Sequence, residues 1–189
     1  VRRTFFLDNA GRDETGLYRY GLNIVNNSLF GYRDKFNLNL YGAEGTQAGA
    51  LTYSLPVNTK GTRVALNYNQ NVTDIISGEY ESVNIEGDYE QYGISINHPA
   101  KIKQGFKIDG NFEYQKKISD TYFSKVKLIT TDVDTYKIGM KTQTIKKSNV
   151  WYTFQSLLKG YTRSGKENYE DPGTTNEFNK YNAVFENQK

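Results

Sequence analysis

The chain has 189 residues, of which 37% are hydrophobic, and its mean hydropathy is −0.73. The formal net charge is +3 with both signs mixed along the chain, which is too little bias to indicate a nucleic-acid partner. The absence of Cys excludes disulfides and thiol chemistry, and 16 Tyr with 10 Phe argue against a disordered chain.

Two classes of protein combine low hydropathy with many aromatic residues. One is the soluble all-β domain, and the other is the outer-membrane barrel, whose lumen face and loops are polar while its lipid face is apolar. No apolar run approaches the roughly 20 residues that a transmembrane helix requires. The choice between the two classes therefore depends on the pattern along the chain.

Apolar and polar residues alternate strictly along most of the chain. Leu22 and Ile24 alternate with Asn23, for example, and period two over such a length predicts a strand with one apolar and one polar face. Nine such segments follow one another, and a tenth precedes them at the start. In chain order the predicted strands cover residues 3–10, 18–24, 36–40, 51–55, 64–69, 92–97, 106–115, 136–141, 150–155 and 181–185.

The connections between these strands fall into two alternating sets. One set is short to moderate in length, and the other contains the long polar stretches, although its first two members are short. Outer-membrane barrels sort their loops in this way, whereas the Greek-key links of a sandwich break the alternation. The first set covers residues 27–34, 58–61, 100–105 and 145–148, and the second covers 12–15, 44–47, 73–87, 117–131 and 161–177.

These patterns predict an all-β fold, an antiparallel up-and-down meander in which every consecutive pair of strands is hydrogen-bonded. Measured from one connection to the next, the segments run about 9–11 residues or somewhat longer, which matches a tilted membrane-spanning strand better than the soluble average of about 5–6. Aromatic residues such as Tyr92 and Tyr114 gather near strand ends, as in an interfacial girdle. We therefore expect a segment of a transmembrane β-barrel.

Alternation also assigns residues to the two faces of the predicted barrel. The face expected to contact lipid carries Leu22, Leu38, Leu66, Ile94, Ile108, Ile138 and Phe154. The face expected to line the pore carries Arg19, Asn23, Asn39, Asn67, Ser95, Lys107, Asp109, Glu113, Lys137 and Lys141, with Gln155 beside Phe154. An Asn-rich wall of mixed sign lacks the apolar patches that would trap an unfolded chain, and an ion-selective pore favours one sign. The polar face thus favours passage of a polypeptide.

No catalytic constellation is visible in the sequence. His98 is the single histidine, and no partners for a hydrolytic triad or a metal site can be identified around it. Asp109 and Glu113 share a face with Lys107, which favours a charged pore wall over a pair of catalytic carboxylates. We expect no enzymatic activity, no cofactor and no metal site.

Four short motifs stand out in the first third of the chain. Residues 7–11 read Leu-Asp-Asn-Ala-Gly, residues 15–19 read Thr-Gly-Leu-Tyr-Arg, and residues 53–56 read Tyr-Ser-Leu-Pro. Residues 26–34 read Asn-Asn-Ser-Leu-Phe-Gly-Tyr-Arg-Asp. Together they resemble the start of the barrel in two-partner secretion transporters, the hemolysin activator (ShlB/FhaC/HecB-like) family of the Omp85 superfamily. In this resemblance residues 26–34 match the first periplasmic turn, with Asn26 where Asp is common.

The resemblance implies a 16-stranded barrel preceded by periplasmic POTRA domains. Residues 1–189 would be a single barrel segment of about ten strands, with the POTRA domains before Val1 and the remaining strands after Lys189. Such proteins export a partner polypeptide, a hemolysin- or adhesin-like exoprotein, across the Gram-negative outer membrane without ATP. The implied partners are that polypeptide and outer-membrane lipid, with no nucleic acid, and the full-length protein is expected to be monomeric.

The residues leave two other interpretations open. The chain could be another outer-membrane barrel, such as an assembly factor, a porin, an adhesin or a complete ten-stranded enzyme. It could also be a soluble β-barrel or sandwich that binds a ligand such as a carbohydrate. A continuous apolar belt on the outer face of the sheet would separate the membrane interpretations from the soluble one.

Overall fold

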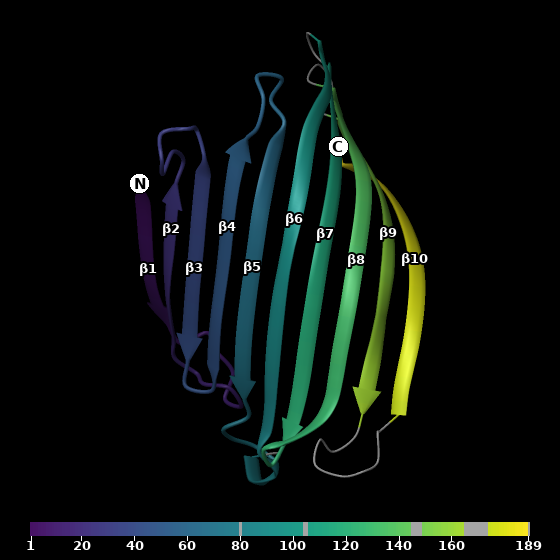
Figure 1. The fold of residues 1–189 in the computed structure, drawn as a ribbon. Coiled ribbons are helices and arrows are strands. Elements are labelled where there is room, and N and C mark those ends of the chain that lie inside the picture. Colours follow the sequence, from purple (N-terminus) through teal and green to yellow (C-terminus); the bar gives the residue numbers. More distant parts are fainter. Residues whose placement is uncertain (80, 104–105, 145–148, 165–173, 189) are drawn as a thin grey trace.

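A computed structural model describes residues 1–79, 81–103, 106–144, 149–164 and 174–188, and beyond residue 143 it describes the backbone alone. It shows one sheet of ten strands in chain order, each antiparallel to the next (Figure 1). The strands are β1 (Arg2–Asp8), β2 (Arg19–Asn26), β3 (Lys35–Ala43), β4 (Thr46–Pro56), β5 (Arg63–Asp74), β6 (Ile85–Lys103), β7 (Phe106–Phe123), β8 (Val126–Thr144), β9 (Asn149–Ser164) and β10 (Thr174–Gln188). The predicted meander is confirmed.

The strands in the middle of the sheet are longer than the alternation indicates. β6, β7 and β8 contain 19, 18 and 19 residues. The long loop expected over residues 117–131 is therefore wrong, because β7 and β8 are joined by a turn of only Ser124 and Lys125. Both residues have positive φ angles, 47° and 65°, as a type I′ hairpin turn requires. The sequence looks like a loop there because both faces of the ribbon are polar.

The other connections differ less from expectation. Residues 75–84, which include the short 3-10 helix η1 (Glu81–Val83), join β5 to β6, so the expected loop over 73–87 is present but shorter. β3 and β4 are joined by Glu44 and Gly45 alone. In the loop expected over 161–177, residues 165–173 lie outside the described residues. Within the described chain, no helix is long and apolar enough to cross a membrane.

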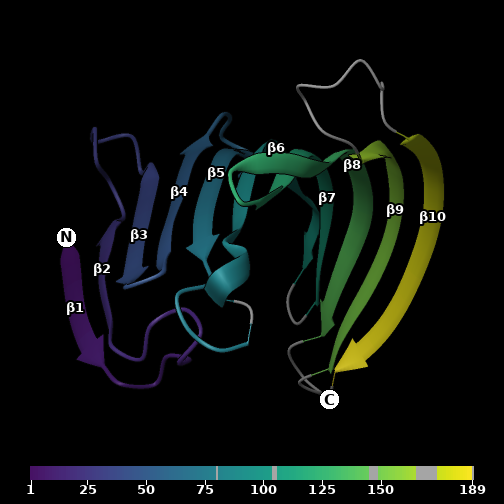
Figure 2. The same ribbon diagram turned by 90° about the horizontal axis from the view of Figure 1, so that it is seen from below.

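The sheet is curved across its width, and Figure 2 shows η1 and the connection between β1 and β2 on its concave side. Cross-strand pairing places Gln115 and Thr135 on one face, and these polar side chains are only 9% and 2% exposed. The opposite face carries Leu66 and Ile138, which are 56% and 61% exposed. Curvature crowds side chains on the concave face and separates them on the convex face. The concave face is thus polar, and the convex face is apolar.

This sheet has no apolar core of its own. Among the described residues, Ala43 is the only hydrophobic residue that is buried. A soluble β domain buries its apolar face against a second layer, but here the apolar face is left uncovered. The absence of a packed second layer within the described chain argues against the sandwich interpretation.

The predicted faces follow the observed register through β8. Leu66 pairs with Ile94, and Phe112 on the face of Ile108 pairs with Ile138. In β9 the expectation is wrong by one residue, because Gln155 pairs with Ile138 while Phe154 pairs with Gly139. A shift of one residue exchanges the two faces of a strand, and residues 150–154 are mostly apolar, so alternation does not define their phase.

Candidate translocation face and lipid-facing belt

Ten of the residues expected to line the pore, all except Gln155, lie at positions of the concave face. Direct cross-strand pairs connect Asn23 with Asn39 and Asp109 with Lys141. Ser95 pairs with Glu113, which in turn pairs with Lys137. The remaining three, Arg19, Asn67 and Lys107, lie an even number of residues from concave positions on their own strands. The register thus brings one polar surface together from β2 to β8.

The first half of this surface is built from neutral amides. Asn23 Nδ2 donates to Asn37 Oδ1 at 3.0 Å, and it also donates to Asn39. Thr52 Oγ1 donates to Asn67 Oδ1 at 3.2 Å. These side chains bond to one another along the ladder, so their polarity is largely satisfied within the wall. These amides give a hydrated surface, and Lys35 and Arg63 add positive charge at its short-turn end.

The second half carries charges that are paired within the wall. Lys107 Nζ lies 2.8 Å from Asp109 Oδ2, and Lys137 Nζ lies 3.4 Å from Glu113 Oε2. At the edge of the sheet, Arg19 Nε lies 2.7 Å from Asp8 Oδ1. Neighbouring opposite charges cancel much of each other's field. The second half of the concave face therefore carries both signs side by side.

The convex face changes from apolar to polar at a row of tyrosines. Tyr68, Tyr92, Tyr114 and Tyr136 are each followed, two residues towards the long-loop end, by Gln70, Glu90, Lys116 and Asp134. The Tyr68 hydroxyl donates to Glu90 at 3.0 Å, and the Tyr114 hydroxyl donates to Asp134 at 2.7 Å. A tyrosine with its ring on apolar residues and its hydroxyl on polar ones suits a membrane–water interface.

The apolar boundary crosses the sheet diagonally. Tyr20 on β2 lies in the cross-strand row of Val72, while Tyr136 on β8 lies in the row of Leu66. The boundary therefore moves six residues, from position 72 to position 66, over the six steps from β2 to β8. That is about 20 Å of strand rise over about 29 Å of strand spacing, a tilt of roughly 35°. Strands of transmembrane barrels tilt by about 35–45°.

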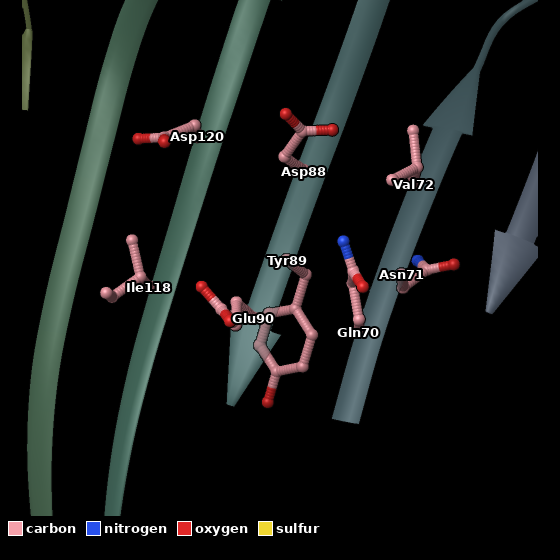
Figure 3. Close-up of a pocket in the computed structure, with 8 residues that line it drawn as sticks. All are labelled: Gln70, Asn71, Val72, Asp88, Tyr89, Glu90, Ile118 and Asp120. Atoms are coloured by element: carbon pink, nitrogen blue, oxygen red, sulfur yellow. The ribbon is translucent and has the colours of Figure 1, made fainter. Parts of the chain in front are cut away.

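Beyond the tyrosines the convex face is a polar ribbon. A hollow of about 190 Å³ lies there, lined by side chains of β5, β6 and β7. Asp88, Glu90 and Asp120 are among these side chains (Figure 3). Asp120 bonds to Thr130 Oγ1 at 2.7 Å and lies 3.2 Å from Lys127 Nζ. No group of side chains in the described part of the chain could hold a metal ion. These residues extend the hairpins into water, which explains why residues 117–131 read as a loop.

The chain was compared with known families and structures. The family model for haemolysin secretion/activation protein ShlB/FhaC/HecB matches residues 1–189. The chain belongs to this family. The family consists of outer-membrane β-barrel proteins of Gram-negative bacteria. A search of curated proteins finds no significant match.

Two solved structures resemble the ShlB/FhaC/HecB chain described here. The match to CdiB from Acinetobacter baumannii has a TM-score of 0.63 at 15% identity, covering 97% of this chain and 38% of CdiB. The match to BamA from Haemophilus ducreyi lacking POTRA domains 1–3 has a TM-score of 0.40 at 11% identity, covering 86% of this chain and 40% of BamA. The CdiB match supports the fold, and the chain spans less than half of either relative.

Sequence reasoning missed two features of this family member. The ion pair of Asp8 and Arg19 joins β1 to β2. The sequence predicts the strand β1 but not its register against β2. The buried Asp34 was seen as part of a turn motif, while its role as a hydrogen-bond acceptor was not. For the first feature, a register of β1 against β2 that places Asp8 opposite Arg19 could have been chosen from the sequence, since opposite charges on facing strands attract.

Proposed function

We propose that the full-length protein is a Gram-negative outer-membrane transporter that carries a partner polypeptide to the cell surface. The observation that carries the proposal is that one curved sheet of a ShlB/FhaC/HecB member has two faces of opposite character. The concave face is polar and internally paired, and the convex face is apolar and uncovered. A barrel wall between water and lipid requires this arrangement.

The lipid-facing role of the convex face rests on three agreeing features. Its apolar side chains are exposed although they are large, as at Leu66 and Ile138. Its boundary is marked by tyrosines whose hydroxyls bond to polar groups on the long-loop side. The diagonal of that boundary corresponds to a strand tilt of roughly 35°, within a few degrees of that of membrane barrels.

The pore-lining role of the concave face rests on its chemistry. A polypeptide in transit carries charges of both signs and exposed apolar side chains, so a suitable wall binds none of them strongly. Amides such as Asn23 and Asn67 give hydration, and pairs such as Lys137 with Glu113 place charges of both signs side by side. Transport of this kind needs transient contacts rather than a preorganised catalytic site.

The finer parts of the proposal follow the family. The exported partner is a hemolysin- or adhesin-like exoprotein, the remaining partner is membrane lipid, and neither nucleic acid nor a cofactor takes part. The rest of a 16-stranded barrel and the POTRA domains belong to the full-length protein, which acts as a monomer without catalysis. The share of CdiB that this chain covers, 38%, agrees with a part of such a barrel.

The test is a secretion assay in cells that carry the full-length gene and its neighbouring candidate substrate. Deletion should abolish export of one protein. A variant that neutralises Lys107, Asp109, Lys137 and Lys141 together should slow export and change ion conductance while the barrel still folds. The control neutralises Lys116 and Asp132, an ion pair of 2.8 Å on the convex face beyond the tyrosines, and should export normally.

If deletion leaves every exported protein unchanged while the flux of a small solute is lost, the secretion proposal fails, and the protein is a porin instead. If the control variant slows export as much as the concave-face variant, the concave face is not the path of the polypeptide. Both results are read from the same cells.

A further inference from the structure

The connection between β2 and β3, residues 27–34, carries a cluster of exposed apolar side chains that the transport proposal does not use. Leu29, Phe30 and Tyr32 are 41%, 67% and 72% exposed. They lie at the short-turn end of the sheet, which is uppermost in Figure 1. Three large apolar side chains on an eight-residue turn form a patch rather than scattered exposure, and such patches mark contact sites.

The turn is held in one shape by a buried carboxylate. Asp34 is 0% exposed, and it accepts hydrogen bonds from the backbone N–H groups of Phe30 and Tyr32 at 3.1 Å. The Tyr53 hydroxyl donates to the same carboxylate at 3.2 Å. Gly31 supplies a φ of 88°, and a Cβ at that position would meet nothing within 4 Å. The apolar side chains are therefore displayed by a rigid loop with open space beside it.

The patch continues the convex apolar face. The rings of Phe30 and Tyr53 meet edge to face with centroids 6.0 Å apart. Tyr53 pairs with Phe36 on one side and with Leu66 on the other, which are both convex positions. The turn thus adjoins the belt that is proposed to contact lipid, on its short-turn side.

The belt on β2 and β3 is too short to cross a bilayer without the turn. On β3 the convex apolar residues run from Leu40 to Phe36, after which the next convex position is Asp34. Four residue steps at the estimated tilt give about 11 Å of height, whereas the apolar band of a barrel is about 25 Å tall. The turn continues the belt on its short-turn side, and its side chains extend the apolar surface towards the periplasmic interface.

The charges at this end suit a lipid headgroup layer. Within residues 26–36 and 56–63, Asp34 is the single acidic residue, and its carboxylate is hidden from solvent. Arg33 is exposed within the turn itself. Apolar side chains beside Lys and Arg are the composition by which peripheral segments enter the interface of an anionic bilayer.

We propose that the turn at residues 27–34 inserts Leu29, Phe30 and Tyr32 into the interfacial layer of the periplasmic leaflet, with Arg33 on anionic phospholipid headgroups. This inference rests on the proposed membrane function. The occupant of the patch is phospholipid, since the patch is continuous with the lipid-facing belt and carries no exposed acid. Asp34 fixes the turn and is screened from the lipid by the loop that it organises.

The test places an environment-sensitive fluorophore on single cysteines in the full-length protein folded into vesicles. The vesicles contain phosphatidylethanolamine and phosphatidylglycerol with brominated acyl chains, which quench only on contact. Tyr32→Cys should be blue-shifted and quenched, more by shallow bromines than by deep ones. Lys60→Cys, on the next short turn, is the matched control and should stay in water. Leu66→Cys reports the belt itself.

The outcomes separate this inference from the proposed function. Quenching at positions 32 and 66 supports both. Quenching at position 66 without quenching at position 32 overturns the inference alone, whether the label at position 32 stays in water or is covered by protein such as a periplasmic domain. Absence of quenching at position 66 removes the membrane function on which the inference rests. Circular dichroism of each labelled variant measures its β-sheet content, so a variant that fails to fold is detected independently of quenching.

Discussion

Replacement of Ile96 by Arg measures whether the convex face contacts lipid. Ile96 is 38% exposed, and it pairs with Val64 and Phe112 on the convex face. It lies four residues from Tyr92 towards the short-turn end, which at a tilt of roughly 35° places it about 11 Å below the tyrosine row. Half of a 25 Å apolar band is about 12 Å, so this side chain lies close to the membrane midplane.

An Arg at the midplane of a barrel costs about 2–4 kcal/mol, which corresponds to a roughly 30- to 900-fold loss in the folding equilibrium constant. In a soluble domain the same change at a partly exposed strand position would usually cost within about 0.5 kcal/mol. The matched control is Ser95→Arg on the adjacent residue of the concave face, where Glu113 lies directly opposite and can pair with the new charge. The control should cost well under 1 kcal/mol.

The measurement is denaturant-induced unfolding of the full-length protein in phospholipid vesicles, followed by fluorescence. Equal losses for the two variants would show that the two faces have the same surroundings. A loss below about 0.5 kcal/mol for Ile96→Arg would return the soluble interpretation to consideration. Either result would refute the assignment of the convex face to lipid.

Three further predictions concern the backbone. In Gly93→Ala the new Cβ would lie 2.5 Å from the Tyr114 carbonyl oxygen, so the free energy of unfolding should fall by about 1–3 kcal/mol. The control is Gly87→Ala on the same strand, where the nearest atom lies 3.9 Å from the new Cβ and the change should be neutral or mildly stabilising. Lys125→Gly should stabilise the β7–β8 hairpin by about 1 kcal/mol, because Lys125 is held at a φ of 65° that glycine adopts without strain. Amide hydrogen exchange in the hairpin should therefore be slower in the variant, and slower exchange in the wild type would contradict this. Burial alone would raise the pKa of Asp34, but hydrogen bonds from the Phe30 backbone, its own backbone, the Tyr53 hydroxyl and the Tyr32 backbone together hold it below its ordinary value of 3.8. This contribution stabilises the turn above about pH 4 and is lost as the pH falls through the lowered pKa, so amide protection at Phe30 and Tyr32 should drop in acid, and Asp34→Asn should remove that pH dependence.

The strand order, and the face on which most residues lie, could be predicted from the sequence, because apolar and polar residues alternate along each strand that has one apolar and one polar face. Leu22 with Asn23 and Ile94 with Ser95 illustrate this, since an apolar residue faces one solvent and its neighbour faces another. The prediction depends on one face meeting water and the other an apolar phase. It needs no knowledge of which strands are neighbours.

The same reasoning explains where prediction failed. Where both faces meet water, as along residues 117–123 of β7, alternation disappears although the backbone ladder continues to the turn at Ser124. Where both faces carry apolar residues, as over 150–154, alternation is ambiguous and its phase was assigned wrongly. The strand tilt could not be predicted either, because it appears only when Tyr20 and Tyr136 are placed on one cross-strand register.

The concave and convex faces together explain how a chain of low hydropathy forms an ordered sheet. In the proposed barrel each strand presents only alternate residues to lipid, and strands such as β7 extend beyond the tyrosine row at Tyr114, so apolar residues are needed at a minority of positions. With Ala43 as the one buried hydrophobic residue among those described, packing within the sheet contributes little. Backbone pairing and transfer of the convex face into lipid must supply the stability instead. The edge strands β1 and β10 each pair with one neighbour, and an open edge is not tolerated within a bilayer. This supports the proposal that further strands of the full-length protein close the barrel around the polar face.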